Sequence, residues 1–207
     1  MELNTAITEV ASFKGANLKV TLGLVKQQLI GKGKSGIISQ PNLFEAAVEI
    51  KKQFAQIDEI VHAAGIIKIL PFILDEGEIV VDLSLAAGAE GEGFDLVTNK
   101  RIAEFKFSRW QADGANGTRK RQVFADFVNL LLNPTKLKKQ LFVHNAEKIE
   151  YFLKSKRAKW QNVLSKSGGL DKTLATHLMA KGITANCLND IFCLDNIQII
   201  DIDEILL

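Results

Sequence analysis

Hydrophobic residues recur every three or four positions along much of the chain, a spacing that predicts amphipathic helices. Within residues 1–30 this pattern predicts one helix, with its apolar side at Leu18, Leu22, Val25 and Leu29. A longer helix is expected from Asn42 to about Gly65. Its apolar positions are Leu43, Ala47, Ile50, Phe54, Ile57 and Val61.

The ends of the longer helix have sequence signals of their own. Asn42 and Glu45 have the spacing of a capping box, in which each side chain binds the other residue's backbone N–H. The apolar run after Gly65 is interrupted by Pro71, and proline disrupts a helix interior. We therefore expect the helix to stop near Gly65.

Several short segments are predicted strands, and alternation of apolar and polar residues marks the first of them. One strand is expected at 78–85, and residues 93–108 form two short strands joined at Asn99-Lys100, a tight turn in which Asn tolerates a positive φ. Further strands are expected at 139–144 and 197–202. The remaining predicted helices cover 118–132, 146–164 and 170–181.

The hairpin at 93–108 has charged residues on one face. With a two-residue loop, Leu96 pairs with Ala103 and Asp95 lies directly opposite Glu104, with Lys106 on the same face. Facing like charges destabilise a strand pair, so we expect a divalent cation to offset the repulsion. A three-residue loop would move Asp95 to the other face. The apolar face is expected to consist of Phe94, Leu96, Phe105 and Phe107.

The overall composition is that of an ordinary globular protein, with 47% hydrophobic and 24% charged residues. The net charge of +2 does not by itself indicate a nucleic-acid-binding protein. Cys187 and Cys193 lack the pattern of a disulfide framework or a metal site. Because no apolar run approaches the ~18 residues of a membrane span and the start does not resemble a signal peptide, we expect a cytoplasmic protein.

The order helix, strand, hairpin, helix, strand is that of the restriction-endonuclease-like fold. Asp95, followed after eight residues by Glu104-Phe105-Lys106, resembles the catalytic signature of the PD-(D/E)XK nuclease superfamily. Phe94 stands where that signature often has proline. The resemblance covers about residues 42–144 and implies one α/β domain over 1–207, with a mixed central sheet flanked by helices. Extra helices are expected before this core and in a C-terminal extension over about 145–207.

The resemblance also implies roles for individual residues. Asp95 and Glu104 would hold Mg²⁺ or Mn²⁺, with the backbone carbonyl of Phe105 as a further ligand. Hard cations of this kind take oxygen ligands and lower the pKa of bound water. Lys106 would stabilise charge on the phosphate oxygens or orient the attacking water.

A third acid and a glutamine complete the site that the resemblance implies. The acid would come from the first core helix, where Glu45 and Glu49 are the two alternatives; Glu45 lies nearer the helix start but also fits the capping box. Gln122 lies in the helix that supplies a glutamine in the RecB-like branch of the superfamily. Its role follows from that resemblance alone.

Cations cluster where the helix dipole disfavours them, at the start of the helix after the hairpin. Arg119, Lys120 and Arg121 there predict a phosphate-binding surface, and Arg109 directly follows the hairpin. These four residues are the expected nucleic-acid contacts.

Three functions fit the sequence. The first is a metal-dependent nuclease that hydrolyses phosphodiester bonds, with DNA as the expected substrate and a homodimer as one allowed assembly. The second is a catalytically inactive nucleic-acid-binding module on the same fold. The third is a structural or partner-binding protein in which Glu104 and Lys106 form a solvated ion pair of little energetic value.

Overall fold

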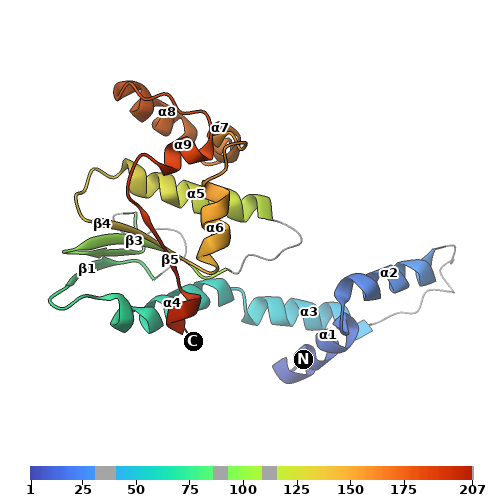
Figure 1. The fold of residues 1–207 in the computed structure, drawn as a ribbon. Helices are drawn as coiled ribbons and strands as arrows, with labels where there is room; N and C mark the ends of the chain where they lie inside the picture. The colour runs from blue at the N-terminus through green and yellow to red at the C-terminus, as the bar shows by residue number, and fades with distance from the viewer. Residues whose placement is uncertain (31–40, 86–92, 109–115, 207) are drawn as a thin grey trace. The chain divides into compact units, whose positions relative to one another are not determined.

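Two compact units make up the chain in the computed structural model, Met1–Asp58 and Glu59–Leu207 (Figure 1). The structure describes residues 1–30, 41–85, 93–108 and 116–206. The boundary between the units falls inside the range 42–144, which the sequence predicted as the nuclease-like core.

Helices form the described part of the first unit: α1 (Leu3–Lys14), α2 (Leu18–Leu29) and α3 (Pro41–Gln53). Helix α1 packs on α3, and Ala6 and Ala46 from these two helices are completely buried. Helix α2 corresponds to the single helix predicted within residues 1–30. Helix α1 was not predicted as a separate helix. Asn17 caps α2, because its Oδ1 accepts hydrogen bonds from the backbone N–H groups of Lys19 and Val20.

The second unit is a mixed α/β structure. Its elements follow the order α4 (Ile57–Ile73), β1 (Val80–Leu83), β2 (Leu96–Thr98), β3 (Arg101–Lys106), α5 (Asn116–Leu132), β4 (Lys138–Val143), α6 (Ala146–Leu153), α7 (Trp160–Leu164), α8 (Leu170–Ala180), α9 (Leu188–Phe192), β5 (Gln198–Asp201) and α10 (Asp203–Leu206). Helix α4 begins two residues before the boundary. Within the described ranges, no helix combines the length and the apolar character needed to cross a membrane.

The five strands form one sheet in the order β1-β2-β3-β4-β5. Strands β1, β2 and β3 are antiparallel neighbours, whereas β3, β4 and β5 are parallel. The predicted C-terminal extension therefore also supplies the edge strand β5. Its predicted helix over 146–164 is two helices, α6 and α7.

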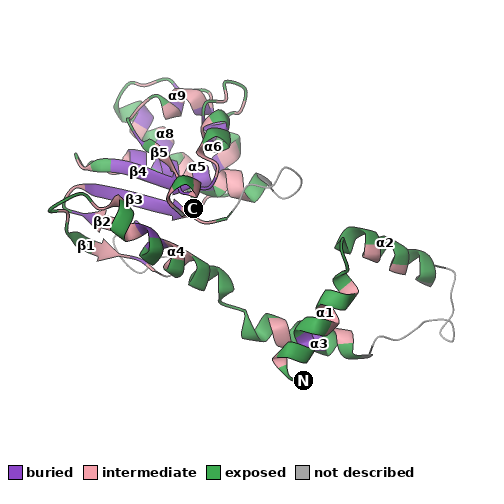
Figure 2. Ribbon diagram, turned by 60° about the horizontal axis from the view of Figure 1, so that its bottom comes forward, coloured by how far each residue is buried: buried purple, intermediate pink, exposed green. Residues whose placement is uncertain are grey.

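Helices cover both faces of the sheet, α4 on one face and α5 and α6 on the other (Figure 1). The α4 side is a small core, in which Ile66 and Ile69 pack with Phe105 and Phe142. The α5 side is a larger core that continues into α7, α8 and α9. Figure 2 shows buried residues concentrated in β3 and β4, as expected for strands covered on both faces.

The prediction of one helix from Asn42 to Gly65 is wrong. Helix α3 ends at Gln53, and α4 continues past Gly65 and includes Pro71. Gly65 does not end the helix but allows close packing, since a Cβ atom there would lie 2.4 Å from the ring of Phe107. The capping box is wrong as well, because α3 begins at Pro41 and Asn42 is already helical.

A buried charged network joins β3 to the segment before β1. Arg101 is 3% exposed, and its Nε donates to Glu78 Oε1 at 2.6 Å. Arg101 also donates to Gln140 Oε1 on β4 at 2.8 Å. Burial opposes ionisation of Glu78, but hydrogen bonds from Arg101 and Thr98 lower its pKa to about 2. The Glu78 side chain is fully covered in this pair.

We expect Glu78→Gln to lower the free energy of unfolding by about 3 kcal/mol at neutral pH, because it leaves the buried Arg101 charge with only the half-exposed Asp75 as its counterion. Glu78 has a lowered pKa, so its contribution is complete above pH 4.5 and is lost as the pH falls toward 2. Urea denaturation over this pH range measures the effect. Exposed Glu76→Gln is the control, and equal stabilities of the two variants would contradict the prediction.

Candidate active site

The β2–β3 hairpin has the predicted register. Leu96 pairs with Ala103, which leaves a two-residue loop, and the next position along places Asp95 opposite Glu104. The predicted register of the hairpin is therefore confirmed, and Asp95, which directly precedes β2, lies close enough to Glu104 for its charge to act on that carboxyl group.

The turn itself is built differently from the prediction. Among the described residues other than glycine, Asn145 has a positive φ and Asn99 does not. Asn99 instead attaches the turn to the segment before β1: its Oδ1 accepts a hydrogen bond from Ile79 N–H at 2.9 Å, and its own N–H donates to Ile79 O. The hairpin loop is thus held by hydrogen bonds to the segment before β1.

The two faces of the hairpin differ as predicted, with one correction. Ala103 and Phe105 lie in the core on the α4 side, whereas Ile102 lies in the core on the α5 side. Phe94 was expected with Phe105 but lies in the α5-side core. The chain is bent at Phe94 and regular β2 begins only at Leu96, so strand alternation does not extend that far.

Asp95 is held on both carboxylate oxygens. His62 Nε2 on α4 lies 3.2 Å from Oδ1, and the backbone N–H of Phe105 donates to Oδ2 at 2.8 Å. Burial opposes ionisation, but these two hydrogen bonds and the charge of Lys106 lower the pKa of Asp95. His62 was interpreted as a structural residue, and the structure places it at the candidate site. Its ring packs edge-on against Phe107, with 5.8 Å between centroids.

Glu104 lies on the α5 side of the sheet and is only 6% exposed. Burial, followed by the charges of Asp95 and Asp126, raises its pKa to about 9. Two carboxylates this close do not both ionise readily in a buried space, so Asp95 is the charged member and Glu104 the protonated one near neutral pH.

Lys106 is paired with an acid that the sequence analysis missed. Its Nζ lies 3.0 Å from Asp126 Oδ2 on α5. Although burial opposes its charge, the nearby carboxylates of Asp126 and Glu104 raise the pKa of Lys106. Burial raises the pKa of Asp126. The Lys106 ammonium is the positive charge that the buried Asp126 carboxylate contacts.

Helical spacing could have found both missed residues. His62 precedes Ile66 and Ile69 by four and seven positions, which places all three on one face of α4. Asp126 is a single acid between Phe124 and Phe127 in an otherwise apolar stretch of α5. A polar residue on a buried helix face needs a partner, and here the partners are the charged residues of the hairpin.

The other predicted site residues are not all part of this cluster. Glu45 is exposed on α3 in the first unit, whereas the hairpin belongs to the second unit. Gln122 is exposed on α5, one turn before Asp126. Phe105 contributes its backbone N–H to Asp95, and the ligand role of its carbonyl stays a prediction.

The predicted nucleic-acid contacts are partly described. Arg119, Lys120 and Arg121 are half-buried in the second turn of α5, and Lys120 lies 5.5 Å from the centre of the Phe152 ring. Arg109 lies outside the described residues.

The donor set fits a hard cation held by two carboxylates. Asp95 and Glu104 offer oxygen ligands from neighbouring strands, and Mg²⁺ usually binds one or two carboxylates and keeps several waters. The nearby Asp126 carboxylate is paired with Lys106 instead. Within the ranges that the structure describes, no three His, Cys, Asp or Glu side chains form a group arranged to bind a metal.

The fold and the cluster define a mixed α/β protein with a buried acid pair at one end of a central hairpin. Comparison with protein-family models, with curated proteins and with solved structures returned no match to this chain.

Metal-free protein should lose stability relative to Glu104→Gln as the pH rises. The folded-state pKa of Glu104 is raised from 4.5 to about 9, so its stabilising contribution is complete below pH 4.5 and is lost by about pH 9. Urea denaturation in EDTA between pH 5 and 9 measures this difference. Exposed Glu59→Gln should keep the wild-type profile, and a pH-independent gap between wild type and Glu104→Gln would contradict the assignment.

Proposed function

We propose that the chain is a nuclease that uses Mg²⁺ or Mn²⁺ to hydrolyse phosphodiester bonds in nucleic acid, with DNA as the expected substrate. The observation that carries this proposal is the position of Asp95 opposite Glu104, with Lys106 on the same face as Glu104. The order α4-β1-β2-β3-α5-β4 and the change from antiparallel to parallel pairing at β3 support a restriction-endonuclease-like core.

The pKa values of Asp95 and Glu104 support a divalent cation as the group that both carboxylates bind. Without one, Glu104 must stay protonated beside Asp95, and a carboxylic acid is a poor metal ligand until it loses its proton. When bound, the divalent ion supplies positive charge that activates water and neutralises the phosphate. Asp95 and Glu104 would hold it, with Asp126 close enough to influence Glu104 through its charge.

The remaining residues of the cluster position these groups. His62 and the Phe105 N–H fix the orientation of the Asp95 carboxylate from two directions. The ion pair with Asp126 keeps Lys106 charged and extended along the α5 side of the hairpin. A charged lysine there would stabilise the negative charge that develops on phosphate oxygens during hydrolysis. Its side chain is 30% exposed, so a substrate can approach it.

The cations in the second turn of α5 suit the same substrate. Arg119, Lys120 and Arg121 lie five to seven residues before Asp126 on one helix. A backbone that contacts these cations would pass within about two helical turns of Asp126. Such contacts position nucleic acid without reading its sequence.

A catalytically inactive binding module is the second candidate. It is favoured by the absence, among the described residues, of a group of three metal-binding side chains, and by the ion pair that already occupies Lys106. Nucleic-acid binding that persists in EDTA and in Asp95→Asn, with no cleavage by wild type, would support this candidate over the nuclease.

Asp95→Asn and Glu104→Gln should each slow cleavage of labelled DNA by at least about 100-fold in Mg²⁺ or Mn²⁺, because each removes one charged oxygen ligand. Circular dichroism and thermal melting check that the variants fold. Glu59→Gln, an exposed acid on α4, should cleave at the wild-type rate. Intact single-stranded, duplex and branched DNA and RNA after incubation with wild type would refute the nuclease.

Binding of Mg²⁺ should release the proton of Glu104. We expect the association constant to rise about tenfold per pH unit between pH 6 and 8.5, since the pKa of Glu104 is about 9 and one proton leaves per ion. Isothermal titration calorimetry in buffers of different ionisation enthalpy counts the released protons. A proton count of zero, or the same pH dependence in Glu104→Gln, would contradict the role of Glu104.

A further inference from the structure

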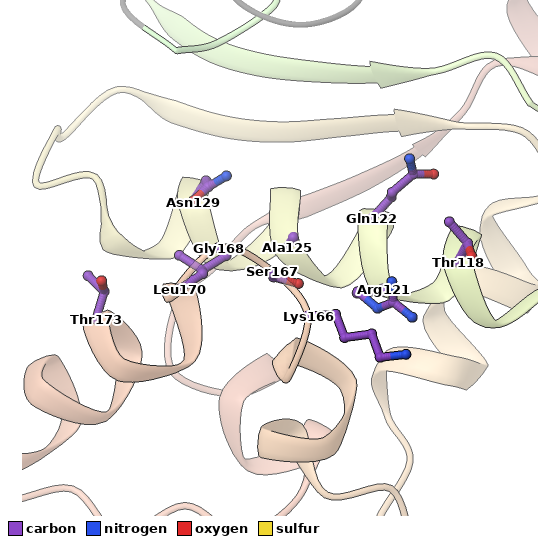
Figure 3. Close-up of a pocket in the computed structure, with 10 residues that line it drawn as sticks. All are labelled: Thr118, Arg121, Gln122, Ala125, Asn129, Lys166, Ser167, Gly168, Leu170 and Thr173. Carbon is purple, nitrogen blue, oxygen red and sulfur yellow. The ribbon is translucent and has the colours of Figure 1, made fainter.

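A hollow of about 580 Å³ lies in the second unit, between α5 and the segment that leads into α8 (Figure 3). We call it the α5–α8 hollow; Arg121 and Gln122 line it from α5, and Lys166 and Ser167 line it from the opposite side. Its lining includes none of Asp95, Glu104, Lys106 and Asp126, and the roles of Asp95 and Glu104 leave it unexplained.

The lining of the hollow is polar and positively charged. Its ten described residues include two cations, Arg121 and Lys166, and no acid. Neither cation takes part in an ion pair within the described part of the chain. Asp171, in the first turn of α8, is not among the lining residues. Two cations that share a hollow repel each other, so an anion bound there would be stabilised by both.

The segment between Lys166 and α8 lines the same space. The Oγ of Ser167 is buried without a hydrogen-bond partner among the described residues, so it does not face the hollow. The first N–H groups of α8 are satisfied within the chain, since those of Leu170 and Lys172 donate to Ser167 O and Gly169 O at 3.0 Å. The two cations that share the hollow are therefore the feature that suits a phosphate group.

We propose that the α5–α8 hollow binds a backbone phosphate of the nucleic acid, a placement that rests on the proposed function for the identity of the ligand. Gln122 lines the hollow, and Asp126 follows it by four residues, about 6 Å of helix rise on the same face of α5. A strand that follows α5 therefore reaches both the hollow and the candidate active site. The hollow would hold the strand at a phosphate next to the one that is cleaved.

Fluorescence anisotropy with a fluorescein-labelled 20-nucleotide single strand and its duplex, in EDTA so that no cleavage occurs, tests the hollow. The double variant Arg121→Gln, Lys166→Gln should raise Kd about tenfold, because charged contacts to phosphate are lost. The slope of log K against log salt should become shallower by about 0.7 to 0.9 for each phosphate contact removed. Lys172→Ala, an exposed lysine of α8 outside the hollow, is the matched control and should bind like wild type.

The inference is overturned if the double variant binds both oligonucleotides with the Kd and salt slope of Lys172→Ala. It is also overturned if inorganic phosphate or AMP binds in a Lys166-dependent way while oligonucleotide binding is unchanged, since the hollow would then take free phosphate. Cleavage assays separate the two proposals. If Asp95→Asn loses cleavage while the double variant binds like wild type, the nuclease proposal stands and the phosphate site in the hollow is refuted. If wild type never cleaves nucleic acid but the double variant binds it more weakly, the phosphate site stands and the nuclease proposal is refuted.

Discussion

Burial of two facing carboxyl groups is the constraint on which the candidate site depends. The two-residue loop sets the register that places Asp95 opposite Glu104, and the helices on both faces of the sheet keep water away from the pair. Hydrogen bonds from His62 and Phe105 N–H favour the charged form of Asp95, and the resulting negative charge helps to raise the pKa of Glu104 to about 9. A fold gains no stability from such a pair by itself, which is why a function for it is a reasonable inference.

The surrounding helices position the residues that contact this pair and its neighbours. Gly65 lets Phe107 approach α4, and Phe107 in turn packs against the ring of His62. On the other face, α5 brings Asp126 to Lys106 and also presents cations at its start. Helix α5 therefore carries Asp126, the predicted nucleic-acid contacts and one side of the α5–α8 hollow. The proposed substrate would follow this single helix.

Local patterns predicted the parts of the fold that are encoded locally. The hairpin register followed from strand alternation and loop length, and the faces of Ala103, Phe105 and Ile102 followed with it. The length of α4 could not be predicted, because Gly65 and Pro71 normally end helices and only the contact with Phe107 explains why Gly65 is tolerated. His62 and Asp126 come from helices far along the chain from the motif, so their contacts with the hairpin required the tertiary structure. Glu45 was chosen on the assumption that the helix starting near residue 42 is the helix packed on the sheet, whereas α4 occupies that place.

The nuclease proposal requires Asp95 and Glu104 to hold a divalent cation together. A crystal structure of the protein soaked in Mn²⁺, with anomalous diffraction measured to locate the metal, tests this requirement. We expect an anomalous peak within bonding distance of one oxygen of each carboxylate, on the side of the hairpin that carries Lys106 and faces α5. A fully soaked crystal with no peak between these two residues, and with Glu104 in the same position as in metal-free protein, would contradict it.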